Sequence, residues 1–69
     1  MNIASERKRL GLRQEDLAEE LKVSKSTVAR WEQNITPPFG DKLVEMHKLF
    51  GCTVDYLLGI TDERTSTRA

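Results

Sequence analysis

The chain has 69 residues, which suffices for one domain near the lower size limit for folding alone and excludes a large enclosed substrate cavity. Eleven basic residues balance eleven acidic ones, so the total charge does not favour nucleic acid, although a balanced total can still present one positive face. The one cysteine excludes an internal disulfide, no apolar run approaches the roughly 20 residues of a membrane span, and the charged first residues do not resemble a signal peptide, so we expect a cytoplasmic protein.

The first predicted helix covers residues 2–10, where Ile3, Arg7 and Leu10 recur at helical spacing. Arg7 lies on the apolar stripe of this helix, where an unpaired cation would be costly. We therefore expect it to form a salt bridge, and Glu32, at the margin of the buried side of the third helix, is the candidate partner. The alternative is that the Arg7 side chain extends past the stripe to solvent.

Residues 14–33 are predicted to form two short helices joined by a tight turn. The first of these helices covers 14–21, and its apolar side consists of Leu17, Ala18 and Leu21. Lys22 and Val23 form the turn, and Ser24 is a good N-cap residue, because its hydroxyl can accept a hydrogen bond from a free amide of the next helix. This is the layout of a helix-turn-helix, whose second helix enters the DNA major groove.

The second helix of this unit, which is expected to end near Gln33, has two dissimilar sides. Val28 and Trp31 share the buried side. The opposite side carries small or polar residues and two long cations: Lys25, Ser26, Ala29, Arg30 and Gln33. Arginine and lysine can donate to guanine, serine and glutamine can bond to several base edges, and alanine can contact a thymine methyl group. The alternative is an ordinary solvated helix face, but the capped helix and the preceding turn favour a DNA-reading surface.

Two further helices are predicted after a loop. Asn34 can close the third helix in the left-handed conformation. A fourth helix, which Gly51 stops, has a stripe made of Leu43, Met46, His47 and Phe50, and a short fifth helix contains Val54, Leu57 and Leu58. Residues 61–69 are polar and are expected to form a mobile tail. No strand-like alternation is present, so the predicted fold class is all-α with five short helices.

Few residues suggest chemistry. His47 is expected to be a partly buried packing residue rather than a ligand or a pH switch. Cys52 is expected to be a small core residue, because no other cysteine or histidine lies at metal-ligand spacing. The sequence contains no arrangement of serine, histidine and aspartate for catalysis and no glycine-rich phosphate loop. We therefore expect no enzyme activity, no metal, no cofactor and no small-molecule substrate.

One set of residues matches the order and spacing of a known family between residue 3 and about residue 59. These residues are Arg7, Leu10-Gly11-Leu12, Gln14, Leu17-Ala18, Val23-Ser24, Val28, Trp31-Glu32, Pro38, Gly51 and Val54-Asp55-Tyr56-Leu57-Leu58. At these positions the chain resembles the Cro/repressor-type (XRE-like) helix-turn-helix domains of phage repressors and their bacterial relatives. The resemblance implies a five-helix domain that binds operator DNA through its third helix, commonly as a two-fold dimer.

The resemblance also implies roles for individual residues. Lys25, Ser26 and Arg30 would read bases, and the Arg7–Glu32 pair would be a family feature. Contacts to DNA phosphates, which set the position of the protein on the duplex, would come from Gln14, Ser24, Thr27 and Gln33.

Four positions depart from the family pattern. Lys22 and Asn34 stand where glycine is usual, and a positive φ would cost the lysine on the order of 1 kcal/mol, whereas asparagine tolerates it better. Arg13 replaces a smaller capping residue, but its guanidinium can reach a DNA phosphate. Ile35 replaces a residue that is often basic, which reduces the expected electrostatic affinity for DNA.

We therefore expect residues 1–60 to form a sequence-specific regulator of transcription, a repressor that binds a double-stranded operator, followed by a polar tail over 61–69. One such module buries only about 600–1,000 Å² on DNA, so we expect a homodimer. The candidate dimer contacts are Val54, Tyr56, Leu58 and Ile60. The alternative is a protein-binding module of the same fold, an antitoxin or an adaptor, which the balanced charge and the apolar Ile35 and Phe39 favour.

Overall fold

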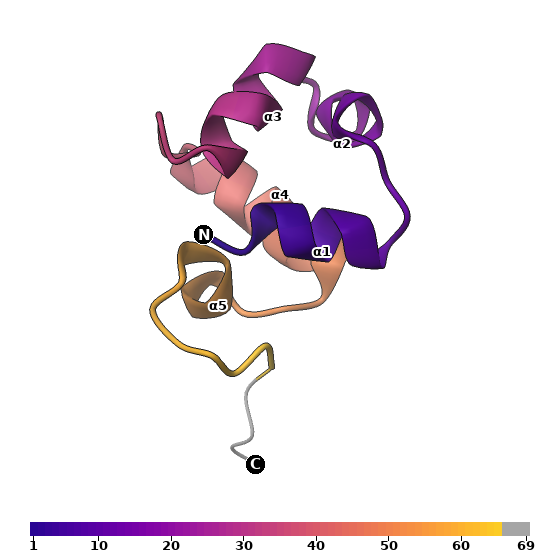
Figure 1. Ribbon diagram of the computed structural model, residues 1–69. Helices are drawn as coiled ribbons and strands as arrows, with labels where there is room; N and C mark the ends of the chain where they lie inside the picture. Colours follow the sequence, from indigo (N-terminus) through magenta and orange to yellow (C-terminus); the bar gives the residue numbers. More distant parts are fainter. Residues whose placement is uncertain (66–69) are drawn as a thin grey trace.

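The computed structural model describes residues 1–65, which form five helices and contain no strand. The helices are α1 (Ile3–Arg9), α2 (Gln14–Leu21), α3 (Lys25–Glu32), α4 (Gly40–Phe50) and α5 (Val54–Leu58). In Figure 1, α2 and α3 form the upper part of the molecule, α1 crosses below them in front of α4, and α5 lies near the N-terminus. This arrangement confirms the predicted all-α fold class. No helix among the described residues has the length and apolar character that crossing a bilayer requires.

The core lies where the five helices meet. Val28 and Trp31, on the predicted buried side of α3, are 0% and 2% exposed. The other buried apolar residues come from the remaining helices and the loop before α5, and they are Ile3, Leu17, Ala18, Leu21, Met46, Phe50, Cys52 and Leu57. Because α2 and α3 pack directly on each other as well as on this core, the helix-turn-helix unit is fixed to the rest of the domain.

The ends of the helices follow from the capping residues in the sequence. The Ser24 hydroxyl accepts a hydrogen bond from the Thr27 amide at the start of α3, as expected for an N-cap. Lys22 and Asn34 both adopt the left-handed conformation, with φ of 57° and 60°. As the sequence predicted, Lys22 ends α2 and Asn34 follows the end of α3. Gly51, with φ of 72°, ends α4.

The buried side of α1 differs from the prediction. Leu10 is 39% exposed and is the C-cap residue at the end of α1. Glu6 is buried instead, at 2% exposure. Its Oε1 atom accepts hydrogen bonds from Arg9 Nε at 3.2 Å and from Arg64 Nε at 2.8 Å, which compensate the burial of its charge.

The segment after α5 folds back onto the domain. The Arg64 guanidinium donates to the Glu6 carboxylate and to the Phe50 carbonyl, and the Arg64 carbonyl accepts a hydrogen bond of 2.9 Å from the Thr53 amide. The expectation of a mobile tail from residue 61 onward is therefore wrong as far as Arg64. The sequence alone could not reveal these contacts, because the partners of Arg64 are distant in the chain. The rest of that expectation, for 66–69, lies outside the described residues.

His47 and Cys52 have different outcomes. Cys52 is 1% exposed, which confirms it as a core residue, and burial raises the pKa of its thiol. His47 is exposed, so its expected packing role is wrong. It lies at the edge of the α4 stripe, where its Nδ1 atom donates to the Cys52 carbonyl and supports the end of the helix.

Candidate nucleic-acid interface

The outward flank of α3, which we define as Lys25, Ser26, Ala29, Arg30 and Gln33, is not covered by the chain among residues 1–65. Four of these residues are exposed and Ala29 is half-buried. The flank lies opposite Val28 and Trp31, so the helix is anchored on one side and open on the other. A helix presented in this way can approach the edges of base pairs.

The start of α3 carries a cluster of hydroxyl groups. The Ser24 hydroxyl lies 2.8 Å from that of Thr27 and 3.1 Å from that of Ser26, and it also accepts from the Thr27 amide at 3.2 Å. Ser24 and Ser26 are exposed, and Thr27 is half-buried. Hydroxyl groups both donate and accept, so these residues can turn a donor toward an external oxygen without leaving the helix uncapped.

Arg13 and Gln14 at the start of α2 differ in how firmly they are held. The Arg13 side chain is 81% exposed and lies 3.5 Å from the Glu15 carboxylate. Its amide donates to Asp16 at 2.8 Å, which satisfies one free group at the helix start. Gln14 is half-buried, and its amide Nε2 donates to Glu32 Oε1 at 3.1 Å. The sequence analysis missed this bond, which fixes the Gln14 side chain against α3.

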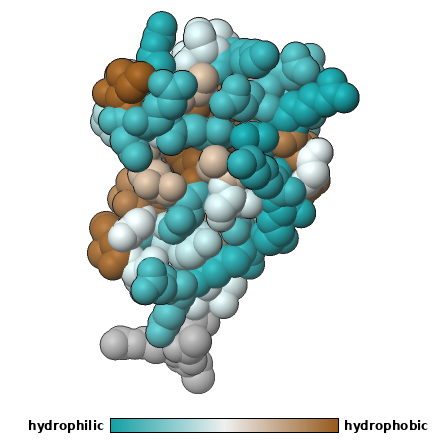
Figure 2. Space-filling view, in the orientation of Figure 1, coloured by the Kyte–Doolittle hydropathy of each residue, from teal (hydrophilic) through white to brown (hydrophobic). Residues whose placement is uncertain are grey.

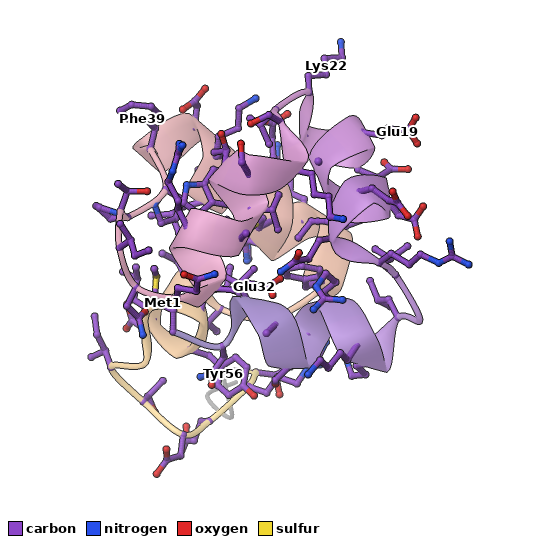
Figure 3. The ribbon with its side chains drawn as sticks, turned by 45° about the horizontal axis from the view of Figure 1, so that its top comes forward. Met1, Glu19, Lys22, Glu32, Phe39 and Tyr56 are labelled. Carbon is purple, nitrogen blue, oxygen red and sulfur yellow. The ribbon has the colours of Figure 1, made fainter. Side chains whose placement is uncertain are left out.

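The predicted Arg7–Glu32 salt bridge is present between α1 and α3. Arg7 Nε lies 2.6 Å from Glu32 Oε2, and Arg7 Nη2 lies 3.1 Å from Glu32 Oε1. Arg7 Nη1 also donates to the Leu12 carbonyl at 2.8 Å. The two side chains are only 11% and 8% exposed, so the alternative of an Arg7 side chain in solvent is excluded. Figure 3 shows Glu32 between α3 and α1, whereas Lys22 and Phe39 project from the surface.

Opposing effects set the pKa of Glu32. Burial alone would raise it, but the hydrogen bonds from Arg7 and Gln14 and the charges of Arg7 and Lys8 outweigh burial and lower the pKa below its usual value. The hydrogen bond to Glu32 likewise raises the pKa of Arg7. Both groups are therefore charged at neutral pH, and they neutralise each other beside the first turn of α2.

The free charges separate between the two helices of the unit. Lys22, Lys25 and Arg30 are exposed on the turn and on α3 and form no ion pair within residues 1–65. The exposed carboxylates of α2 are Glu15, Glu19 and Glu20. Figure 2 shows a mostly hydrophilic face with scattered apolar patches, of which two lie at its left edge. A chain with no net charge can therefore present a positive surface along α3.

A groove of about 470 Å³ follows the edge of α3. It is lined by apolar and polar residues: Val23, Ser24, Thr27, Arg30, Trp31, Thr36, Pro37, Phe39 and Lys42. Phe39 is 79% exposed, and Ile35, which is not part of the groove, is 63% exposed. The groove lies beside the hydroxyl cluster of α3, so any molecule that binds it also approaches the outward flank.

The four candidate dimer residues lie on and just after α5. Val54, Tyr56 and Leu58 are half-buried, and Ile60 is 70% exposed. Asn2 ties this helix to the N-terminus, because its side chain donates to the Tyr56 carbonyl at 2.6 Å and its amide donates to the Leu57 carbonyl at 2.9 Å. Within residues 1–65, no three side chains of the types that hold a metal come together.

The sequence matches a known protein family. The family model described as Helix-turn-helix matches residues 3–57, which is most of the chain. A second comparison found the uncharacterized HTH-type transcriptional regulator YobD of Bacillus subtilis, 40% identical over 57 residues, which are 83% of this chain and 51% of that protein. Repressor protein C2 of Salmonella phage P22 is 38% identical over 56 residues, which are 81% of this chain and 26% of that protein.

The chain spans about half the length of one of these relatives and about a quarter of the other. No solved structure gave a significant match. One relative is named as a regulator of transcription and the other as a repressor. Neither is named as an enzyme, which agrees with the expectation from the sequence. The family match, the five helices and the uncovered α3 lead to one assignment: the chain belongs to the helix-turn-helix family of the Cro/repressor (XRE) type.

Proposed function

We propose that this chain is a sequence-specific DNA-binding regulator of transcription, a repressor, which reads the major groove of a double-stranded operator with α3. The observation that carries the proposal is the outward flank of α3, which is uncovered, polar and cationic. The names of the two relatives support the same function. As a regulator of this kind, the protein would act in the cytoplasm on chromosomal or phage DNA.

Base reading is assigned to the first and middle turns of α3. Arg30 and Lys25 would donate to guanine O6 and N7, Ser26 would bond to a neighbouring base edge, and Ala29 would lie close to a thymine methyl group. The small side chains of Ser26 and Ala29 support this assignment, because they let the helix approach the base pairs while the two cations extend beside them.

Phosphate binding is assigned to the residues around the flank. Ser24 and Thr27 offer hydroxyl donors at the start of α3, and Gln33 lies exposed at its end. The exposed Arg13 side chain can exchange its 3.5 Å contact with Glu15 for a phosphate. The remaining amide hydrogen of Gln14 can donate to a phosphate while Glu32 holds the side chain. These contacts would set the position of the protein on the duplex without selecting sequence.

The proposal is tested by selection of binding sites from random duplexes, followed by affinity measurements on Arg30→Ala. We expect this substitution to relax preference at one base pair and to cost about 1–3 kcal/mol there, whereas Gln14→Ala should weaken all sequences alike. Lys48→Ala, which removes an exposed cation from α4, is the matched control. If Arg30→Ala changes neither affinity nor preference, the assignment of the reading surface is wrong.

Two copies are proposed to act together on DNA. One module of this size gives limited contact, so useful affinity needs two half-sites about 34 Å apart, one helical turn of DNA. With Ile60 exposed and Val54, Tyr56 and Leu58 half-buried around it, the end of α5 is the proposed contact between the copies.

A protein-binding module remains the second candidate, and the exposure of Phe39 and Ile35 favours it. Salt dependence separates the two functions. A DNA complex must weaken steeply as salt rises, because each phosphate contact releases a counterion, whereas an apolar protein interface need not weaken. Measurement of duplex affinity between low and physiological salt therefore decides between them.

A further inference from the structure

The turn between α2 and α3 is held by bonds of two kinds. Within the chain segment itself, the Val23 amide donates to the Ala18 carbonyl at 3.0 Å and the Lys22 amide donates to the Glu19 carbonyl at 3.2 Å. This is the Schellman pattern that ends a helix at a left-handed residue. It does not satisfy the carbonyl of Leu21, the last residue of α2.

Lys42 on α4 satisfies that carbonyl. Its Nζ atom lies 2.7 Å from Leu21 O and 3.0 Å from Glu45 Oε2, and its side chain is only 19% exposed. A cation at the C-terminal end of a helix also interacts favourably with the helix dipole. Two of the three N–H donors of the ammonium group are thus engaged, and one bond joins α4 to the last residue of α2, directly before the turn.

The position of this bond matters because the turn is strained. Lys22, the next residue, has φ of 57°, a conformation that lysine rarely adopts. Three residues after Leu21, Ser24 caps α3, and Lys25 and Ser26 follow directly. The turn is therefore held at its start by Lys42 and at its end by the Ser24 cap, and any shift at Leu21 moves the first turn of α3.

We propose that Lys42 is a positioning residue for DNA reading: its ammonium group fixes the start of the turn and thereby the place of Lys25 and Ser26 in the major groove. This inference rests on the proposed function. Lys42 lines the groove beside α3, so the competing explanation is that it binds a DNA phosphate directly. A third explanation is that it contributes only to the stability of the fold.

The experiment compares Lys42→Met with Lys48→Met, which removes an exposed cation from the same helix. The duplexes are the selected site, the same site with single base pairs replaced, and a random-sequence duplex. The base pairs contacted by the start of α3 are identified first, as those where Lys25→Ala and Ser26→Ala lose preference. Unfolding curves establish the temperature at which every variant is fully folded, and binding is measured there.

If Lys42 is a positioning residue, Lys42→Met should discriminate between the correct and the replaced base pairs about fivefold less well than the unmodified chain. This loss should be smaller than the loss caused by removing a reading side chain. Its affinity for the random-sequence duplex and the salt dependence of that affinity should equal those of Lys48→Met. Unchanged discrimination would overturn the inference. Equal weakening on all duplexes, with the salt slope reduced by about one, would also overturn it, because that result identifies a direct phosphate contact.

A second variant and a second measurement cover the case in which Lys42→Met does not fold. Lys42→Gln keeps a polar side chain that is too short for the Leu21 carbonyl, and the same outcomes apply to it. Amide hydrogen exchange at Lys22 and Val23, whose amides donate within the turn, should be faster in this variant than in Lys48→Met, and equal exchange would contradict the tether. If the unmodified chain binds no duplex at all, the proposed function fails, and that result is separate from every outcome above.

Discussion

The carboxylate of Glu32 bonds to side chains from two other parts of the chain. Arg7 on α1 donates to both of its oxygens, and Gln14 at the start of α2 donates to one of them. Through this one group, at the margin of the buried side of α3, α3 is joined to α1 and to α2. Its ionisation is therefore expected to control both stability and the place of α3.

Acid should weaken the fold through Glu32. Its pKa is lower in the folded chain than the value of about 4.3 in an unfolded one, so its contribution is present above that value and is lost as pH falls through the folded pKa. We expect Glu32→Gln to reduce the free energy of unfolding by about 3 kcal/mol at neutral pH, because Arg7 is left buried without its partner. The same variant should show a flatter dependence of stability on pH as the pH falls below about 5.

Chemical denaturation at a series of pH values measures both effects. Glu19→Gln is the control, because Glu19 is an exposed glutamate of α2 that forms no ion pair within residues 1–65. If the free energy of unfolding falls with pH equally steeply in Glu32→Gln and in the unmodified chain below pH 5, protonation of Glu32 does not contribute to acid unfolding.

At the scale of the element, the turn between α2 and α3 carries strain that can be removed. Lys22 has positive φ, which costs a residue with a Cβ atom more than it costs glycine. We expect Lys22→Gly to raise the free energy of unfolding by about 0.5–1 kcal/mol, as measured by denaturant titration. Glu20→Gly, inside α2, should lower it by about 1 kcal/mol, and a loss in both variants would refute the strain.

The helix ends and the ion pair of α1 were predictable from the sequence because their signals are local. Ser24 and Asn34 belong to residue types that favour caps and left-handed turns, and the place of Arg7 on an apolar stripe required a partner. The burial of Glu6 and the bond from Lys42 were not predictable. Their partners Arg64 and Leu21 are distant in sequence, and a glutamate or lysine on an amphipathic helix is normally solvated.

At the scale of the whole molecule, the arrangement of charge matters more than its total. The exposed acids of α2 and the free cations of the turn and α3 occupy neighbouring helices, so the chain can be neutral in total and still direct a positive side toward DNA. The proposed dimer contact at the end of α5 belongs to a different part of the molecule from α3 (Figure 1). Binding and pairing should therefore be separable by mutation.

Ile60→Asp tests this separation. We expect it to leave the affinity for a single half-site unchanged and to abolish cooperative binding to two half-sites, because a charge would be buried between the copies. Sedimentation of the complexes on duplexes with one and two half-sites measures the stoichiometry. Val44→Asp is the matched control, since Val44 is an apolar residue of α4 that is 46% exposed. If both variants bind two half-sites as the unmodified chain does, the copies pair elsewhere.

The fold-back of Arg64 has a consequence for protein engineering. The family match ends at residue 57, and a designer who grafts this DNA-reading unit onto another protein would naturally cut there. Such a chimaera would lack the guanidinium that shares Glu6 with Arg9, and it would leave the Thr53 amide without its acceptor. A junction placed after Arg64 avoids both defects, so the transferable unit is longer than the homology alone suggests.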